Sequence, residues 1–78
     1  MELTKDWQLL STSRCLVQNL TAGAAPRILY STKVPTPLDS YSKAFKLNTT
    51  EIVTLPKPAS GGIYIQSNTT AIVVVQDL

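Results

Sequence analysis

Short β-rich runs separated by turn residues constrain this chain more than any other feature. The runs are rich in Val, Ile, Thr and Tyr, and turn-forming residues interrupt them roughly every 8 to 12 positions, as in all-β sandwiches and barrels. No window repeats its apolar residues with the period of a helix. The runs span residues 7–11, 13–20, 27–32, 43–47, 50–55, 61–67 and 70–75. The sequence therefore predicts an all-β fold, a small antiparallel β-sandwich or jelly-roll-like barrel of about seven short strands.

The connections between these runs predict two hairpins. Residues 13–20 and 27–32 flank a turn of small residues, so we expect them to pair with each other. Residues 61–67 and 70–75 flank Asn68 and Thr69, which predicts a terminal hairpin. The connection over residues 33–42 contains two prolines and predicts a surface loop, either a crossover between sheets or a functional segment that covers an edge.

The small size of the chain limits how it can be stabilised. Its 78 residues predict a single domain, residues 1–78, with residues 1–11 as a candidate extended N-terminal arm. A domain of this size buries only about 60% of the surface that its unfolded chain exposes, and small scaffolds usually need disulfides, a metal or oligomerisation. Cys15 is the only cysteine and the chain has no histidine, which excludes an internal disulfide and argues against a metal site. We therefore expect a homo-oligomer.

No catalytic motif is recognisable in the sequence. Without histidine, the usual base for a Ser or Cys nucleophile is missing, and the acidic residues are isolated from one another. Cys15 lies in an alternating apolar run, which predicts a small core residue. Gly61 and Gly62 lack the Lys-Ser/Thr pair and the strand-to-helix context of a phosphate loop. The chain is therefore predicted not to be an enzyme and to bind no cofactor and no metal.

The charge pattern bears on the class of partner. Charged residues make up 15% of the chain and the net charge is +2, with the seven Lys and Arg residues dispersed rather than clustered. Nucleic-acid binders gather such residues on one face, so no nucleic-acid partner is expected. No run approaches the roughly 18 apolar residues of a transmembrane helix, and the acidic N-terminus does not resemble a signal peptide. We expect synthesis in the cytoplasm and no membrane partner.

The run Ile72-Val73-Val74-Val75 is apolar on both faces. Because side chains alternate along a strand, Ile72 and Val74 share one face, and Val73 and Val75 share the other. One face should meet the core, and the other is covered by the rim of the second sheet, covered by a neighbouring chain, or left uncovered. We assign Val73 and Val75 to the candidate interface.

Two aromatic residues, Trp7 and Tyr64, complete this candidate interface. Trp and Tyr are enriched at the contact hot spots of protein interfaces. Trp7 either anchors onto a neighbouring chain or folds onto its own sheet, and the sequence leaves both possibilities open.

Taken together, the runs resemble small β-sandwich virion proteins of tailed bacteriophages. The pattern consists of Trp7 near the start, the runs 17–20 and 27–30, a Pro-rich loop, and two final runs over residues 61–67 and 70–75. Proteins of this group serve as head decoration, head–tail junction or tail accessory subunits. The resemblance implies no enzymatic activity, no cofactor, and binding to a capsid or tail through symmetric copies.

We therefore expect a non-enzymatic structural virion protein that binds major capsid, portal or tail proteins as repeated copies, after synthesis in the host cytoplasm. An alternative is a glycan- or cell-surface-binding module at a tail tip. The feature that would favour this alternative is clustering of Trp7, Tyr30, Tyr41 or Tyr64 on one exposed face beside Asn or Asp. A third possibility is a small inhibitor directed at the host.

Overall fold

A computed structural model describes residues 1–36 and 44–78 of the chain, and every regular element in these residues is a strand. The strands are β1 (Glu2–Leu3), β2 (Gln8–Ser11), β3 (Cys15–Asn19), β4 (Arg27–Ser31), β5 (Phe45–Lys46), β6 (Ile52–Leu55), β7 (Gly62–Gln66) and β8 (Ala71–Asp77). Pro26 directly precedes β4 and Pro56 directly follows β6, because proline lacks the N–H that a ladder requires. The predicted all-β class is confirmed, and each predicted run contains or overlaps a strand.

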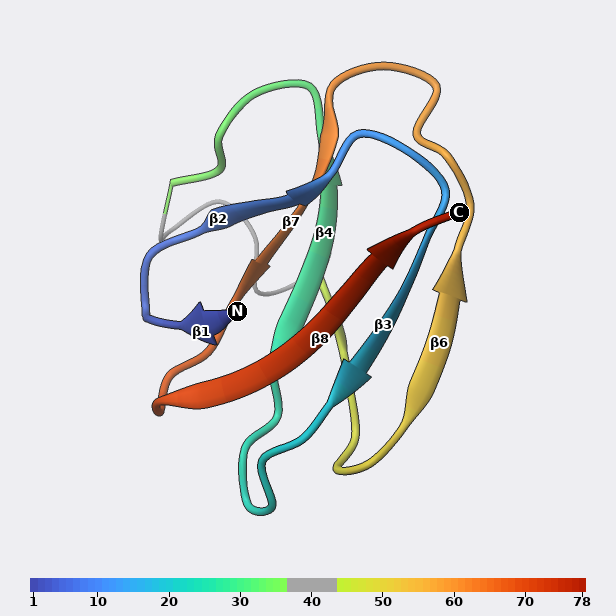
Figure 1. The fold of residues 1–78 in the computed structure, drawn as a ribbon. Coiled ribbons are helices and arrows are strands. Elements are labelled where there is room, and N and C mark those ends of the chain that lie inside the picture. Colours follow the sequence, from blue (N-terminus) through green and yellow to red (C-terminus); the bar gives the residue numbers. More distant parts are fainter. Residues whose placement is uncertain (37–43) are drawn as a thin grey trace.

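The strands form two antiparallel sheets that pack face to face as a small β-sandwich (Figure 1). One sheet has the order β1-β8-β3-β6 and the other the order β2-β7-β4-β5. Four pairs are nested within one another: β4 with β5, β3 with β6, β2 with β7, and β1 with β8. The chain is thus a long two-stranded ribbon, rolled so that β3 also pairs with β8 and β4 with β7. This strand order is that of a jelly roll.

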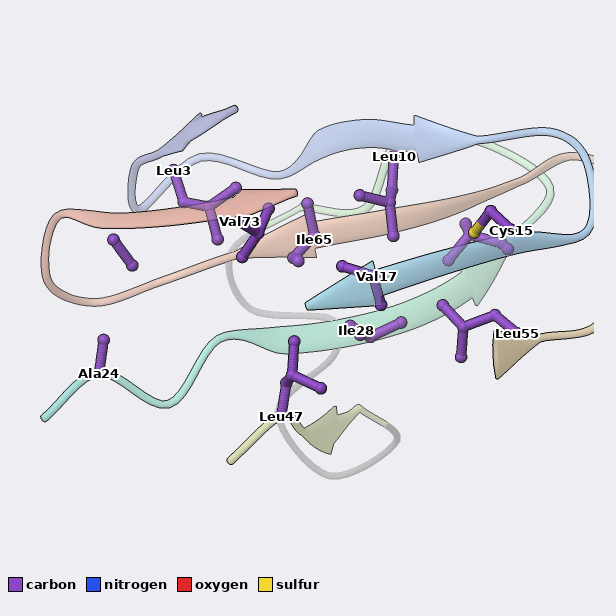
Figure 2. Close-up of a cluster of buried hydrophobic side chains, with 12 residues drawn as sticks. Leu3, Leu10, Cys15, Val17, Ala24, Ile28, Leu47, Leu55, Ile65 and Val73 are labelled. Atoms are coloured by element: carbon purple, nitrogen blue, oxygen red, sulfur yellow. The ribbon is translucent and has the colours of Figure 1, made fainter. Parts of the chain in front are cut away.

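The core lies between the two sheets, where alternate residues of each strand point inward. Cys15 and Val17 of β3 are fully buried, as are Ile63 and Ile65 of β7 in the opposite sheet. Figure 2 shows this buried cluster, in which Val17 and Val73 come from the β1-β8-β3-β6 sheet and Ile28 and Ile65 from the β2-β7-β4-β5 sheet. The cluster consists of Leu3, Leu10, Cys15, Val17, Ala24, Ile28, Leu47, Leu55, Ile63, Ile65, Ala71 and Val73.

Both predicted hairpins are wrong. The strands β7 and β8 belong to different sheets, and so do β3 and β4. The short connection after β7 crosses the sandwich instead of turning back within one sheet. Ser67, which directly follows β7, donates its backbone N–H to the carbonyl of Thr4 at 2.9 Å. Its partner therefore lies in the connection between β1 and β2 and not within a hairpin turn.

Residues 1–11, which the sequence allowed to be an extended arm, are part of the sandwich. Leu3 of β1 pairs with Ala71 and is fully buried, and Leu10 of β2 is also in the core. The N-terminal ammonium donates a 2.9 Å hydrogen bond to the carbonyl of Val73. The first segment therefore supplies an edge strand to each sheet, β1 to one sheet and β2 to the other.

The long connection predicted over residues 33–42 lies between β4 and β5. Residues 33–36 contain no strand, in agreement with the prediction, and residues 37–43 lie outside the described part of the chain. The strand predicted over residues 43–47 is shorter, since β5 consists of Phe45 and Lys46 alone.

Candidate interaction surface

The surface of the β1-β8-β3-β6 sheet that faces away from the core is called here the outer face. Residues directly opposite one another on neighbouring strands share a face, so the register defines its members. They are Glu2, Leu16, Gln18, Ile52, Thr54, Ile72, Val74 and Gln76. Among these described residues, Glu2 alone carries a charge, and it lies at the rim on β1.

Exposed aliphatic side chains dominate the outer face. Ile52 is 57% exposed, Ile72 48% and Val74 47%. Leu20, which directly follows β3, is 50% exposed and donates its N–H to the carbonyl of Ile72 at 3.0 Å. A cluster of half-exposed aliphatic residues with little charge has the composition found at the centre of protein interfaces, which are depleted in charged residues.

The assignment of Val73 and Val75 to an interface is corrected by the register. Val73 is fully buried in the core, and Val75 packs against the core from the edge of the cluster. The residues of β8 that face outward are Ile72 and Val74 instead. The physical reason is that β8 is apolar on both faces, so alternation alone could not tell which face meets the second sheet. Only the pairing of Val73 with Asn19 on β3 decides this.

Trp7 and Tyr64 do not belong to the outer face either. Trp7 lies in the connection between β1 and β2 and is only 7% exposed, so it folds onto its own domain. Its indole Nε1 is buried without a hydrogen-bond partner, as is Oε1 of Gln8. Tyr64 pairs with Leu9 and Leu29 and is half-buried on the exterior of the second sheet. The structure therefore does not bring the predicted interface residues together.

Cys15 is a core residue, as predicted, and its thiol is fully buried. Burial raises the pKa of this thiol, the negative charge of Asp77 raises it further, and a hydrogen bond with Ser11 lowers it in part. A raised pKa keeps the sulfur protonated and unreactive at neutral pH. Within residues 1–36 and 44–78, no three His, Cys, Asp or Glu side chains are grouped so that they could hold a metal ion.

A second surface feature is an open groove of about 510 Å³ between the end of β4 and the β6–β7 connection. Its lining is formed by Tyr30, Ser31, Thr32, Pro58, Ala59 and Ser60. The Tyr30 hydroxyl donates a 2.6 Å hydrogen bond to the carbonyl of Pro56, which fixes the ring along the groove. Burial raises the pKa of this phenol, and Cys15 adds a smaller contribution in the same direction.

The described aromatic residues do not form one platform. Tyr30 pairs with Ile63 and so lies on the core side of its sheet, whereas Tyr64 lies on the opposite side. Trp7 is buried, and Tyr41 lies outside the described residues. The Tyr30 groove thus offers one aromatic ring together with several hydroxyl groups.

No helix that could cross a membrane occurs in the described part of the chain. Comparisons with protein families, curated proteins and solved structures find no match to this chain.

Proposed function

We propose that this chain is a non-enzymatic structural subunit of a tailed-phage particle, held on the capsid or tail in repeated copies by the outer face. The observation that carries the proposal is the cluster of exposed aliphatic residues, Ile52, Ile72 and Val74, on a surface with almost no charge. A rigid sheet face of this composition suits contact with another protein surface.

The architecture and the size of the domain support the proposal. Jelly rolls occur among viral capsid proteins, although they also occur in lectins and cupins, so the fold lends support by analogy alone. One outer face of a small domain provides a weak contact by itself. Many copies on a symmetric lattice multiply such contacts through avidity.

The test is retention of the chain on purified particles of the phage that encodes it. Mass spectrometry of those particles should detect the chain and give its copy number, with hundreds of copies for capsid decoration and far fewer for a neck or tail ring. A Val74→Lys variant should be lost from the particles, because a charge is placed at the centre of the contact. Particles that lack the wild-type chain would overturn the proposal.

A matched control uses the opposite sheet. Leu9 is 49% exposed on the exterior of the β2-β7-β4-β5 sheet, which makes it comparable in chemistry and exposure to Val74. Leu9→Lys should stay on the particles at the wild-type copy number. Equal loss of both variants would mean that added charge alone prevents retention, and the outer face would then have no special role.

The alternative function, a glycan-binding module, is favoured by one observation, the Tyr30 groove with its aromatic ring and its Ser and Thr hydroxyls. Tyrosine rings and hydroxyl groups suit an uncharged polyol such as a sugar. A glycan array followed by titration tests it. Binding should be lost in Tyr30→Ala and kept in Tyr64→Ala, and an array without hits would remove this alternative.

A further inference from the structure

The two sheets, as the described residues form them, have four edge strands, which differ in how they are protected against pairing with another chain. Sheet edges present unpaired N–H and C=O groups, and proteins usually blunt them with short strands, charges, prolines or bulges. The strand β1 has two residues, including Glu2, and β5 has two residues, including Lys46. The strand β2 is interrupted by an irregularity between Leu9 and Ser11. Each of these three edges therefore carries a protective device.

The fourth edge strand, β6, carries none of these devices. Its four residues, Ile52–Leu55, are uncharged, contain no proline and pair with β3 in an unbroken register. Three of them are β-branched, which favours an extended strand. No described strand lies beyond β6, which forms the outermost strand of its sheet (Figure 1).

The backbone bonds of Asn19 fix which groups of β6 point to the free edge. The N–H of Asn19 donates to the carbonyl of Glu51 at 3.3 Å, so this carbonyl faces β3. Backbone groups alternate in direction along an antiparallel strand, so those of Val53 face β3 as well. The N–H and C=O groups of Ile52 and Thr54 therefore point outward at the edge.

We propose that β6 pairs with β6 of a second copy of this chain, antiparallel and centred on Val53, to join two sandwiches through a continuous sheet. In this register Ile52 of one copy is opposite Thr54 of the other, and both present edge-facing backbone groups. The two Val53 side chains meet across the two-fold axis as a close, non-hydrogen-bonded pair. Pro56 has no N–H and ends the ladder beyond Thr54.

A second copy fits this edge because the strand is complementary to itself. No like charges are opposed within the paired residues, and β-branched residues face β-branched residues, which stabilises cross-strand pairs. The two Glu51 side chains lie at opposite ends of the ladder.

The contact is short, so the association is reversible and depends on concentration. Specific interfaces that persist usually exceed about 1,000 Å² of buried surface, which a four-residue edge does not reach alone. The β6 pairing uses the edge of the sheet and does not depend on binding of the outer face to a particle.

Sedimentation equilibrium over a concentration series tests the pairing. The weight-average mass should rise from the 8.5 kDa of one chain towards twice that value. Hydrogen exchange should slow at the amides of Ile52 and Thr54 as concentration rises, while the Val53 amide, which already faces β3, should not change. A chain that stays monomeric at millimolar concentration overturns the proposal.

The decisive variant is Thr54→Pro, because the Thr54 N–H is edge-facing and its loss removes no bond to β3. We expect this variant to be a folded monomer. If the proline variant does not fold, Thr54→Lys replaces it, because it places a charge opposite Ile52 of the second copy and should also give a monomer. Gln76→Lys on the outer face is the control that distinguishes the edge from the outer face, and it should still dimerise. Dimers that persist in both Thr54 variants would overturn the pairing, and dimers lost only in Gln76→Lys would move the contact to the outer face.

Discussion

The side-chain hydroxyl of Ser11 donates a 2.5 Å hydrogen bond to a carboxylate oxygen of Asp77. Ser11 ends β2 in one sheet and Asp77 ends β8 in the other, so this bond joins the two sheets near the C-terminus. The same hydroxyl accepts a 3.0 Å bond from the N–H of Ser13 at the entry to β3. One small side chain thus fixes both a turn and the contact between the sheets.

Removing either partner of this bond should destabilise the fold. Hydrogen bonds to charged groups contribute about 1.5–3 kcal/mol, so Ser11→Ala and Asp77→Ala should each lower the free energy of unfolding by about 1–3 kcal/mol. Urea denaturation followed by the fluorescence of buried Trp7 measures this change. The double variant should cost less than the sum of the two single ones. Strict additivity would show that the two residues act independently.

The two glycines with positive φ should respond differently to alanine. Gly61 has φ 71° and Gly23 has φ 81°, so both substitutions incur backbone strain of about 1–3 kcal/mol. Only at Gly61 would the added Cβ meet other atoms, at 2.2 Å from the carbonyl oxygen of Ser31. Gly61→Ala should therefore lower the thermal midpoint clearly more than Gly23→Ala, where nothing lies within 4 Å. Equal losses would show that the Ser31 segment moves aside freely.

Neighbouring valines of β8 should differ in their effect on stability. Val73 is fully buried, and truncating it leaves a cavity, so Val73→Ala should cost about 2–3 kcal/mol of unfolding free energy. Val74 is 47% exposed on the outer face, and Val74→Ala should stay within about 0.5 kcal/mol. Chemical denaturation of both variants at low protein concentration checks the assignment of the two faces. The reverse order of losses would contradict the register of β8 against β3.

Stability should decline in mildly alkaline solution. Burial raises the pKa of the Cys15 thiol, so the unfolded chain loses this proton at a lower pH than the folded chain does. The contribution of the protonated Cys15 thiol to the free energy of unfolding is complete below the pKa of the unfolded thiol. It is lost as the pH rises through the pKa of the folded thiol. The unfolding midpoint should therefore fall over this window. In Cys15→Ala the unfolding midpoint should fall less steeply with pH. The decrease that remains comes from Tyr30, whose pKa is raised in the same direction. Identical slopes would exclude Cys15 as the source.

The positions of the strands were predictable because local residue types determine them. Turn residues and prolines delimit β3, β4, β6 and β7 in the sequence itself, and the alternation in residues 15–19 placed Cys15 and Val17 on one buried face. The short β1 was missed because two residues carry no period. Its position depends on Leu3 reaching the core and on the pairing with Ala71, both of which are long-range.

Which strands pair was not predictable, because a hairpin and a crossover share one local pattern. In a hairpin two consecutive strands exchange backbone bonds, whereas in a crossover their side chains face each other across the core. The residues around Asn68 fit either arrangement. The choice depends on distant partners, such as the carbonyl of Lys5, which accepts a 3.2 Å bond from the buried side chain of Gln66. The outer face was missed for the same reason, since the role of Val74 follows from its register with Gln18.

The rolled ribbon has a consequence for how the chain acquires its structure. Every nested pair joins segments on either side of the β4–β5 connection, and the outermost pair joins residues 2–3 to residues 71–72. Folds dominated by such distant pairings form slowly, because the entropy of closing each loop is lost before the contacts compensate for it. During synthesis, β1, β2 and β3 emerge before the strands that they pair with, because β6, β7 and β8 all follow the β4–β5 connection in the sequence. The core can therefore close only after β8 has been synthesised. Among the described residues, a chain that stops before β8 leaves β1 without the one strand that it pairs with and β3 without one of its two neighbours.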